Sequence, residues 1–282
     1  MAVSTSPIDP TFPSDAVLTT WWLGQAGFAI RFRDDLLLID PYLSDVLADK
    51  YAGKRFGHVR LHDAPVQPAQ ISGLSTVLCT HGHTDHMDLG TIPFLQIASD
   101  PVFVVPRAEA GRALSRGVSV SRLVGLDAGE TLRTRAGVCI TAVPAAHEEL
   151  TVDAHGQNVF LGFVLDFDGY RIYHSGDCAP YLGQHELLRS LEVDLALLPV
   201  NGRDDDRNGN GVPGNFTLPE ALELCRAAGI PRLVVHHWGL FAFNTADPAA
   251  LARELADVTD IDVTIPALGA PVAIVSDADV RA

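Results

Sequence analysis

The sequence predicts an α/β (α+β) fold in which helices cover the faces of β-sheets. Short apolar runs bounded by Gly, Pro and Asp recur along the 282 residues, and they outnumber the helical patterns. Several runs are apolar at consecutive positions, which is typical of strands buried on both faces. Such sheets are covered by helices, because each apolar face must pack against another layer.

The expected elements follow from these runs and from helix end signals. Strands are predicted over eight segments: 36–39, 76–79, 102–105, 138–143, 159–167, 171–174, 194–199 and 233–236. Helices are predicted over three: 107–116, 218–228 and 248–255. Thr217 and Glu220 have the spacing of a capping box, Gly229 follows the last turn of that helix, and Asp247 is the expected cap of the third.

Composition and charge limit the domain organisation and the partners. The chain has 47% hydrophobic residues and a net charge of −15, which excludes a disordered chain and argues against a nucleic-acid partner. It contains no apolar stretch long enough to span a membrane and no recognisable targeting signal. We expect a loose N-terminus over 1–16 and one domain over 17–282. We also expect a cytoplasmic location and a small-molecule substrate, and a homo-oligomer is a possible assembly.

A cluster of metal-ligand side chains follows the expected strand 76–79. The run Thr80-His-Gly-His-Thr-Asp-His86 places three histidines and an aspartate within six residues. In extended backbone the imidazoles of His81 and His83 point to the same side. Imidazole nitrogens and carboxylate oxygens are ligands that suit zinc, iron or manganese. The sequence therefore predicts a metal site at a sheet edge.

This HxHxDH pattern after an apolar strand resembles the signature of the metallo-β-lactamase superfamily. Four further segments occur in the order expected for that family: an apolar run ending at Asp40, a run ending at His147, the segment His174-Ser-Gly-Asp177, and a run ending at His236-His237. Together they extend over residues 20–245. The resemblance implies a four-layer αββα sandwich with metal ions at one edge.

A narrower resemblance concerns the kind of reaction. Segment 21–28 (WWLGQAGF), segment 173–177 (YHSGD) and the later pair of histidines are similar to the L-ascorbate-6-phosphate lactonase-like branch of metal-dependent hydrolases. This implies cleavage of a lactone or phosphoester of a small polar, anionic metabolite. A phosphodiesterase, nuclease or thioesterase of the same fold remains an alternative, and so does a metal-binding sensor without turnover.

The resemblance also assigns roles to individual residues. In chain order, the residues that it places at the metals are His81, His83, Asp85, His86, His147, Asp177 and His237. His81, His83 and His147 would hold one divalent ion, and Asp177 would bridge it to a second. Zinc is the first choice, with manganese or iron as alternatives. A water between two cations would lose a proton near neutral pH, and Asp85 would orient the hydroxide or accept a proton.

Four residues are candidates for supporting or substrate-contacting roles. Asp40 is expected to hold a ligating histidine or, alternatively, to cap a turn. His174 and His236 are expected behind the ligands, at the substrate, or in the core, and His237 is preferred as the ligand because Trp-Gly-Leu-Phe follows it. Arg203 is expected at an anionic group of the substrate or in a solvated turn. Segment 53–68 is a candidate lid.

Overall fold

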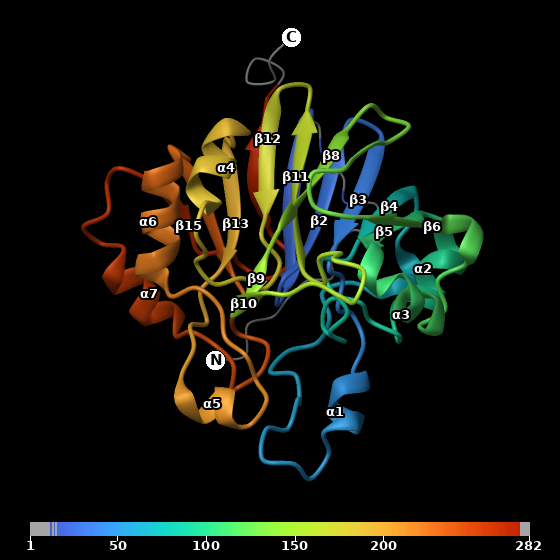
Figure 1. Cartoon of the computed structure of the whole chain (residues 1–282), viewed down its shortest axis with the longest axis horizontal. Coiled ribbons are helices and arrows are strands. Elements are labelled where there is room, and N and C mark those ends of the chain that lie inside the picture. Colours follow the sequence, from blue (N-terminus) through green and yellow to red (C-terminus); the bar gives the residue numbers. More distant parts are fainter. Residues whose placement is uncertain (1–11, 13, 15, 277–282) are drawn as a thin grey trace.

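The computed structural model describes Phe12, Ser14 and residues 16–276, and it contains two seven-stranded mixed sheets that pack face to face. Helices cover the outer face of each sheet, so that the layers run helix, sheet, sheet, helix (Figure 1). The four-layer αββα sandwich expected from the sequence is confirmed.

The first sheet has the strand order β16-β1-β2-β3-β4-β5-β6. Its strands in chain order are β1 Leu18–Gly24, β2 Gly27–Phe32, β3 Asp35–Ile39, β4 Leu74–Leu78, β5 Val102–Pro106, β6 Leu123–Leu126 and β16 Pro271–Val275. Strands β1 to β3 form antiparallel hairpins, whereas β3 to β6 run parallel. The loops that leave β3, β4 and β5 therefore emerge at the same edge of the sheet.

The second sheet has the order β15-β14-β13-β12-β11-β8-β7. Its strands are β7 Thr131–Arg133, β8 Cys139–Pro144, β11 Leu161–Phe167, β12 Tyr170–His174, β13 Leu195–Pro199, β14 Arg232–His236 and β15 Asp262–Thr264. Strands β12 to β15 are parallel, so their carboxyl ends also share one edge. A short separate ribbon of β9 Ala146–His147 and β10 Glu149–Leu150 follows β8.

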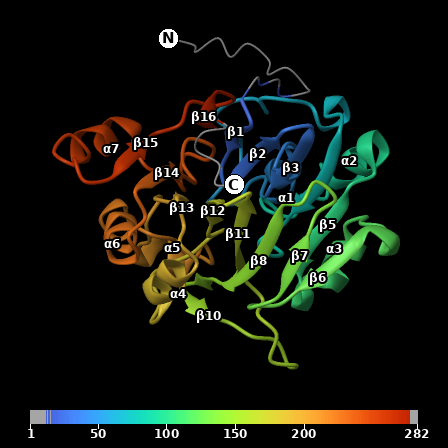
Figure 2. The same ribbon diagram turned by 90° about the horizontal axis from the view of Figure 1, so that it is seen from above.

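The helices divide between the two sheets and one end of the sandwich (Figures 1 and 2). Helices α2 Ile92–Ser99 and α3 Ala110–Ser115 cover the first sheet. The second is covered by α4 Gln184–Ser190, α6 Leu218–Ala228 and α7 Pro248–Glu254. The short helices α1 Val46–Lys50 and α5 Asp205–Gly209 lie below the sheets in Figure 1. In the described residues, no helix is long and apolar enough to cross a membrane.

Apolar side chains form a continuous layer between the two sheets. Phe28 and Ile30 of β2 are fully buried there, opposite Phe163 and Leu165 of β11 in the same cluster. Burial of side chains of this size contributes about 1.5–3 kcal/mol each. The hydrophobic effect therefore fixes the two sheets against each other, and with them every loop that leaves their shared edge.

The sequence predictions agree with most of the elements that carry the site. All eight predicted strands overlap observed strands, and the helix predicted over 218–228 coincides with α6. Its capping box is present, and the Asp247 side chain accepts the Ala249 N–H at the start of α7. The helix predicted over 107–116 divides into a 3₁₀ turn, Arg107–Glu109, and α3. Strand β1 was not predicted, because polar Thr19 and Thr20 interrupt its apolar pattern although both are buried.

Phe12 and the two tryptophans Trp21 and Trp22 belong to the core. Of the predicted loose segment 1–16, only Phe12, Ser14 and residue 16 are among the described residues, and the rest of that prediction lies outside them. Phe12 is fully buried against Trp21, with ring centroids 5.4 Å apart. Trp22 stacks on Trp238 at 4.9 Å. Both tryptophans therefore fill the core and do not line a pocket.

The capping box of α6 generates a test of how this helix is stabilised. The side chain of Thr217 pairs with Glu220, and both satisfy N–H groups at the helix start. We predict that Thr217→Ala lowers the free energy of unfolding by about 1 kcal/mol in urea titrations. Thr151→Ala, at an exposed threonine, is the control. Equal stability of the two variants would contradict the assigned cap.

Candidate metal centre

The candidate centre lies where the loops after parallel strands of both sheets meet. The segment 81–86 follows β4 of the first sheet, whereas Asp177 follows β12 and His237 follows β14 of the second. His147 comes from the ribbon strand β9. Seven residues from four separate segments of the chain therefore come together because the two sheets pack with these edges side by side.

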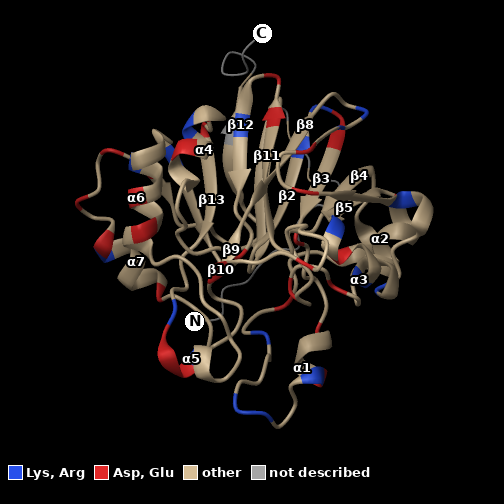
Figure 3. Cartoon of the chain, viewed as in Figure 1, with Lys and Arg blue, Asp and Glu red and all other residues tan. Residues whose placement is uncertain are grey.

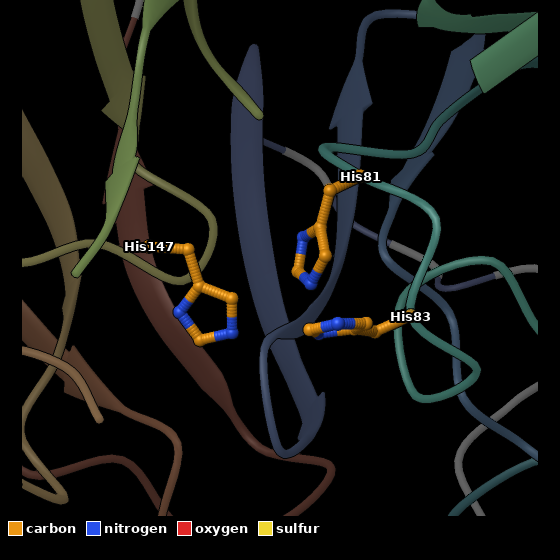
Figure 4. A group of neighbouring side chains, drawn as sticks. All are labelled: His81, His83 and His147. Atoms are coloured by element: carbon orange, nitrogen blue, oxygen red, sulfur yellow. The ribbon is translucent and has the colours of Figure 1, made fainter. Parts of the chain in front are cut away.

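The ligand-type atoms fall into three groups, in each of which all atoms lie within 4.8 Å of one another. These groups are His81, His83 and His147; His81, His86 and Asp177; and Asp85, His86 and His237. Figure 4 shows the first group, in which the rings of His81 and His83 from one loop face the ring of His147 from the ribbon that follows β8. The seven predicted ligands thus occupy one cluster.

Asp177 stands between two parts of this cluster. Its Oδ2 is 3.7 Å from His147 Nε2, while its Oδ1 is 3.3 Å from His86 Nε2 and 3.0 Å from His237 Nε2. Asp85 Oδ2 lies 3.8 Å from His86 Nε2 and 4.0 Å from His237 Nε2. The two oxygens of Asp177 therefore face different sets of histidines, which is the arrangement a bridging carboxylate requires.

Asp40 fixes the orientation of the loop that follows β4 through hydrogen bonds with Thr80 and His86. Its Oδ1 accepts the backbone N–H of Thr80 at 2.7 Å, and its Oδ2 accepts the Thr80 hydroxyl at 2.6 Å. The same Oδ2 lies 2.7 Å from His86 Nδ1, which must be the protonated nitrogen because a carboxylate only accepts. The lone pair of His86 is thereby placed on Nε2, on the side of Asp177. Asp40 thus contacts a cluster histidine, one of the two roles expected for it.

A second histidine is oriented through the same threonine. The Thr80 hydroxyl donates to Asp40, so its oxygen is free to accept from His81 Nδ1, 3.1 Å away. The lone pair of His81 then lies on Nε2. One carboxylate therefore fixes the proton positions of both His81 and His86, as supporting groups behind metal ligands do.

Several buried nitrogen and oxygen atoms of the cluster have no hydrogen-bond partner, and this fits the binding of a cation. His81 Nε2, His86 Nε2 and Asp177 Oδ1 are buried without a hydrogen-bond partner. Buried polar atoms are nearly always satisfied, so a group of such atoms facing one another indicates a missing ligand. All three are of the donor types that zinc, manganese and iron take.

The charges in the cluster point to the same ligand. Burial lowers the pKa of His147 to about 4 and that of His81 well below its usual value, so both are neutral at pH 7. Burial alone also lowers the pKa of His86, but Asp177, Asp40 and Asp85 together raise it well above its usual value. A positive charge at this position is therefore favoured, and a divalent cation would supply it.

His237 and His236 diverge although they are adjacent. His236 ends β14, is fully buried, and stacks on His174 with ring centroids 5.0 Å apart. His237 has φ 64°, a backbone conformation uncommon for residues other than glycine, and it leaves the strand direction toward Asp177. The structure thus places His237 in the cluster and His236 in the core.

His174 connects the hairpin of the first sheet to the Asp177 loop. Its Nε2 donates to the carbonyl oxygen of Ala26 at 2.8 Å, and its Nδ1 accepts the N–H of Gly176 at 2.9 Å. Burial lowers the pKa of His174, which keeps the ring neutral and suited to this pattern. Among the expected roles, the structure places His174 behind the cluster. It is fully buried and contacts the backbone of the loop that carries Asp177.

Gln25 is a site residue that the sequence reasoning missed. It lies in the β1–β2 turn, and its Nε2 is 3.1 Å from Asp85 Oδ2 and 3.2 Å from His237 Nε2. Its carbonyl oxygen accepts the backbone N–H of His237 at 2.9 Å. Segment 21–28, which carries part of the narrower resemblance, contains Gln25, but a neutral amide is not a typical metal ligand and so was not selected from the sequence.

A cavity of about 330 Å³ opens onto the cluster. Its walls include His83, Asp85, His147 and Asp177, together with residues of α1 and of the segment after it. Lys54, Arg55, Phe56 and His58 of the predicted lid line the cavity, and residues 210–213 after α5 line the opposite part. The predicted lid therefore forms a wall of the cavity.

Arg203 has other partners. Its guanidinium pairs with Glu220 and donates to the Asn215 carbonyl oxygen at 2.8 Å, and it is not among the described residues that line the cavity. Arg207 likewise pairs with Asp204, the cap of α5, and contacts Asn244. Both arginines therefore hold the segment around α5, in keeping with the turn expected as the alternative for Arg203, and a contact of Arg203 with a substrate anion stays a prediction.

Comparisons with known proteins agree with this architecture. The family model described as the beta-lactamase superfamily domain matches residues 36–238. The UPF0173 metal-dependent hydrolase of Rubrobacter xylanophilus is 30% identical over 255 residues, covering 87% of this chain and 93% of that protein. A protein of the same name from Archaeoglobus fulgidus is 28% identical over 250 residues, covering 86% and 94%.

Solved structures share the fold at lower identity. An isothiocyanate hydrolase from Delia radicum gut bacteria has a TM-score of 0.68 at 18% identity and covers 91% of this chain and 99% of its own. A metallo hydrolase from Ignicoccus hospitalis has a TM-score of 0.66 at 18% identity, covering 90% and 97%. At this identity the likeness shows the fold alone. The family model, the relatives and the ligand cluster together establish that the chain belongs to the metallo-β-lactamase superfamily.

Proposed function

We propose that the protein is a metal-dependent hydrolase that binds two divalent cations and cleaves a lactone or phosphoester of a small anionic metabolite. The names of the relatives support the hydrolase class. The ligand-type residues support two cations: His81, His83 and His147 on one side, and Asp85, His86 and His237 on the other. Zinc is the first choice for this donor set.

The observation that carries the proposal is the position of Asp177. Its two oxygens face His147 on one side and His86 and His237 on the other. A carboxylate between two histidine sets balances two cations at once, and a single-metal site has no need of it. Bound cations would polarise a carbonyl or phosphoryl oxygen of the substrate and lower the pKa of a water between them.

The residues of the chain can handle the protons of such a reaction. Asp85 lines the cavity, and Gln25 Nε2 holds its Oδ2 at 3.1 Å. As a water oxygen attacks the ester, its proton passes to the Asp85 carboxylate, and the same group returns a proton to the departing oxygen. This needs no serine or cysteine nucleophile. The buried positions of His81 and His86 exclude bulk water from behind the reacting atoms.

The cavity favours a small anionic substrate. Its volume of about 330 Å³ suits a metabolite and leaves no room for a folded nucleic acid. Lys50, Lys54 and Arg112 line it although the chain as a whole carries a charge of −15. A local group of cations in an acidic protein attracts an anion to this opening. We therefore favour a small-molecule hydrolase over a nuclease of the same fold.

The first test is metal content together with activity. We predict about two metal ions per chain by elemental analysis, since a bridged centre holds two. Hydrolysis of at least one member of a panel of lactones, phosphomonoesters, phosphodiesters and thioesters should be lost on chelation and restored by one cation. A metal-loaded protein inert across this panel would instead support a sensor without turnover.

Two substitutions test the cluster itself. Asp177→Ala and His83→Ala should each abolish turnover and reduce the metal content, while circular dichroism stays that of the parent protein. His185→Ala is the matched control, because His185 is exposed on α4 and pairs with Glu186 outside the cluster. Full activity in both cluster variants would refute the dinuclear centre.

Asp40 offers a separate test of how the ligands are positioned. Asp40→Asn keeps the shape but replaces one accepting oxygen by a donating amide, so it cannot accept all three hydrogens that Asp40 receives from Thr80 and His86. We predict a loss of about 10- to 100-fold in metal affinity, measured by competition with a chromogenic chelator. Asp247→Asn is the control, because asparagine also caps a helix. Unchanged affinity in Asp40→Asn would show that Asp40 does not orient the ligands.

A further inference from the structure

The two lysines of the chain occupy one place in the fold. Lys50 and Lys54 are the only lysines in the sequence. The rest of its 20 lysine and arginine residues are arginines. Lys50 ends α1, and the N–H of Lys54 donates to the Tyr51 carbonyl oxygen in the turn that follows. Both lysines line the cavity that contains Asp85 and Asp177. Figure 3 shows these basic positions in α1 and the loop after it.

The two ammonium groups approach the same aromatic ring. Lys50 Nζ and Lys54 Nζ each lie 5.1 Å from the ring centroid of Tyr51. This ring stacks on His58 at 4.1 Å, and His58 contacts Phe241 and Phe243 in turn. Burial lowers the pKa of His58, and the charge of Lys50 lowers it further. The aromatic ring beside the two ammonium groups is therefore anchored, through His58, to Phe241 and Phe243.

The arginines of the cavity already have partners. Arg55 pairs with Asp206 at 2.7 Å, and Arg112 pairs with Glu109. Arg116 donates to the backbone carbonyl oxygen of His83 at 3.1 Å. By contrast, neither lysine forms an ion pair with any carboxylate in the part of the chain that the structure describes. Lys50 and Lys54 are thus the cations of this cavity whose charged groups contact neither a carboxylate nor a carbonyl oxygen among the described residues, whereas Arg116 contacts carbonyl oxygens.

We propose that Lys50 and Lys54 bind the anionic group of the substrate, a phosphate or a carboxylate, while the bond to be cleaved lies at Asp85 and Asp177. This inference rests on the proposed function in placing the reacting bond, but the anion site itself does not. Two like charges beside one ring repel each other, and an anion between them removes that repulsion. Lysine suits the task because its ammonium is a compact charge on a flexible stem.

Chemical labelling tests the site without any turnover. Because the chain has two lysines, mass spectrometry can follow the acylation of each by an N-hydroxysuccinimide ester. Inorganic phosphate or acetate should slow the acylation of both lysines, and sodium chloride of equal ionic strength should not. A lysine-containing reference peptide in the same tube controls for reagent loss. Acylation unaffected by both anions would overturn the proposal. Protection by one anion alone identifies the oxyanion that the site takes.

Binding measurements with variants separate the lysines from the metal cluster. In calorimetric titrations with the protecting anion, Lys50→Gln/Lys54→Gln should weaken binding by about 10- to 100-fold, as expected for charge-assisted hydrogen bonds. Lys50→Arg/Lys54→Arg should restore part of it. Arg133→Gln/Arg135→Gln, which removes the same charge from the exposed β7–β8 hairpin, should leave binding unchanged. Equal loss in both glutamine pairs would show a general charge effect and refute a specific site.

Kinetics distinguish this proposal from the proposed function. With an anionic substrate, Lys50→Gln/Lys54→Gln should raise KM at least tenfold with a much smaller change in kcat, and with a neutral analogue KM should not change. Unchanged KM for the anionic substrate would refute the lysine site while leaving the hydrolase intact. Anion protection in a protein that hydrolyses nothing would refute the hydrolase and support the lysine site.

Discussion

The buried carboxylate of Asp40 is the contact on which the metal centre depends most directly. A fully buried charge is costly unless donors surround it, and Asp40 receives three hydrogens, two from Thr80 and one from His86. Its donors are the groups whose orientation the centre needs. The end of strand β3, which Asp40 directly follows, and the loop after β4 are therefore held together by the same bonds that orient His81 and His86.

The centre is also a product of the packing of two sheets. The first sheet supplies the loop 81–86, the second supplies Asp177 and His237, and the ribbon after β8 supplies His147. Neither sheet alone brings these groups together, so the apolar layer around Phe28 and Phe163 is what sets the spacing between them. Hydrophobic burial supplies the free energy that keeps like-charged and unpartnered polar atoms close. The site is thus assembled by residues that take no part in its chemistry.

The fold and the clustered residues could be predicted from the sequence because these residues lie in segments that closely follow apolar strands. The ends of such strands are visible in the local sequence pattern. It did not predict partners that are distant in the chain. Arg203 meets Glu220, whose carboxylate also completes the capping box of α6, and no local signal ranks that partner above a substrate. Gln25 reaches His237 across 212 positions, through a turn and a strand edge. The position of Lys50 and Lys54 at one cavity is likewise seen only in the folded chain, and no local pattern in the sequence indicates it. The metal ions and the substrate stay predictions.

The double hydrogen bonding of His174 has a mechanical consequence. Because both nitrogens of this imidazole are hydrogen-bonded, its orientation is fixed. The ring connects the Ala26 carbonyl oxygen, in the β1–β2 turn of the first sheet, to the Gly176 N–H, in the loop after β12 of the second. Separating the two sheets at this edge would break the hydrogen bond to Ala26 and displace Asp177 from its neighbours. The cavity is therefore open between α1, the segment after it and the loops at this edge, and a substrate reaches the cluster there and not between the sheets.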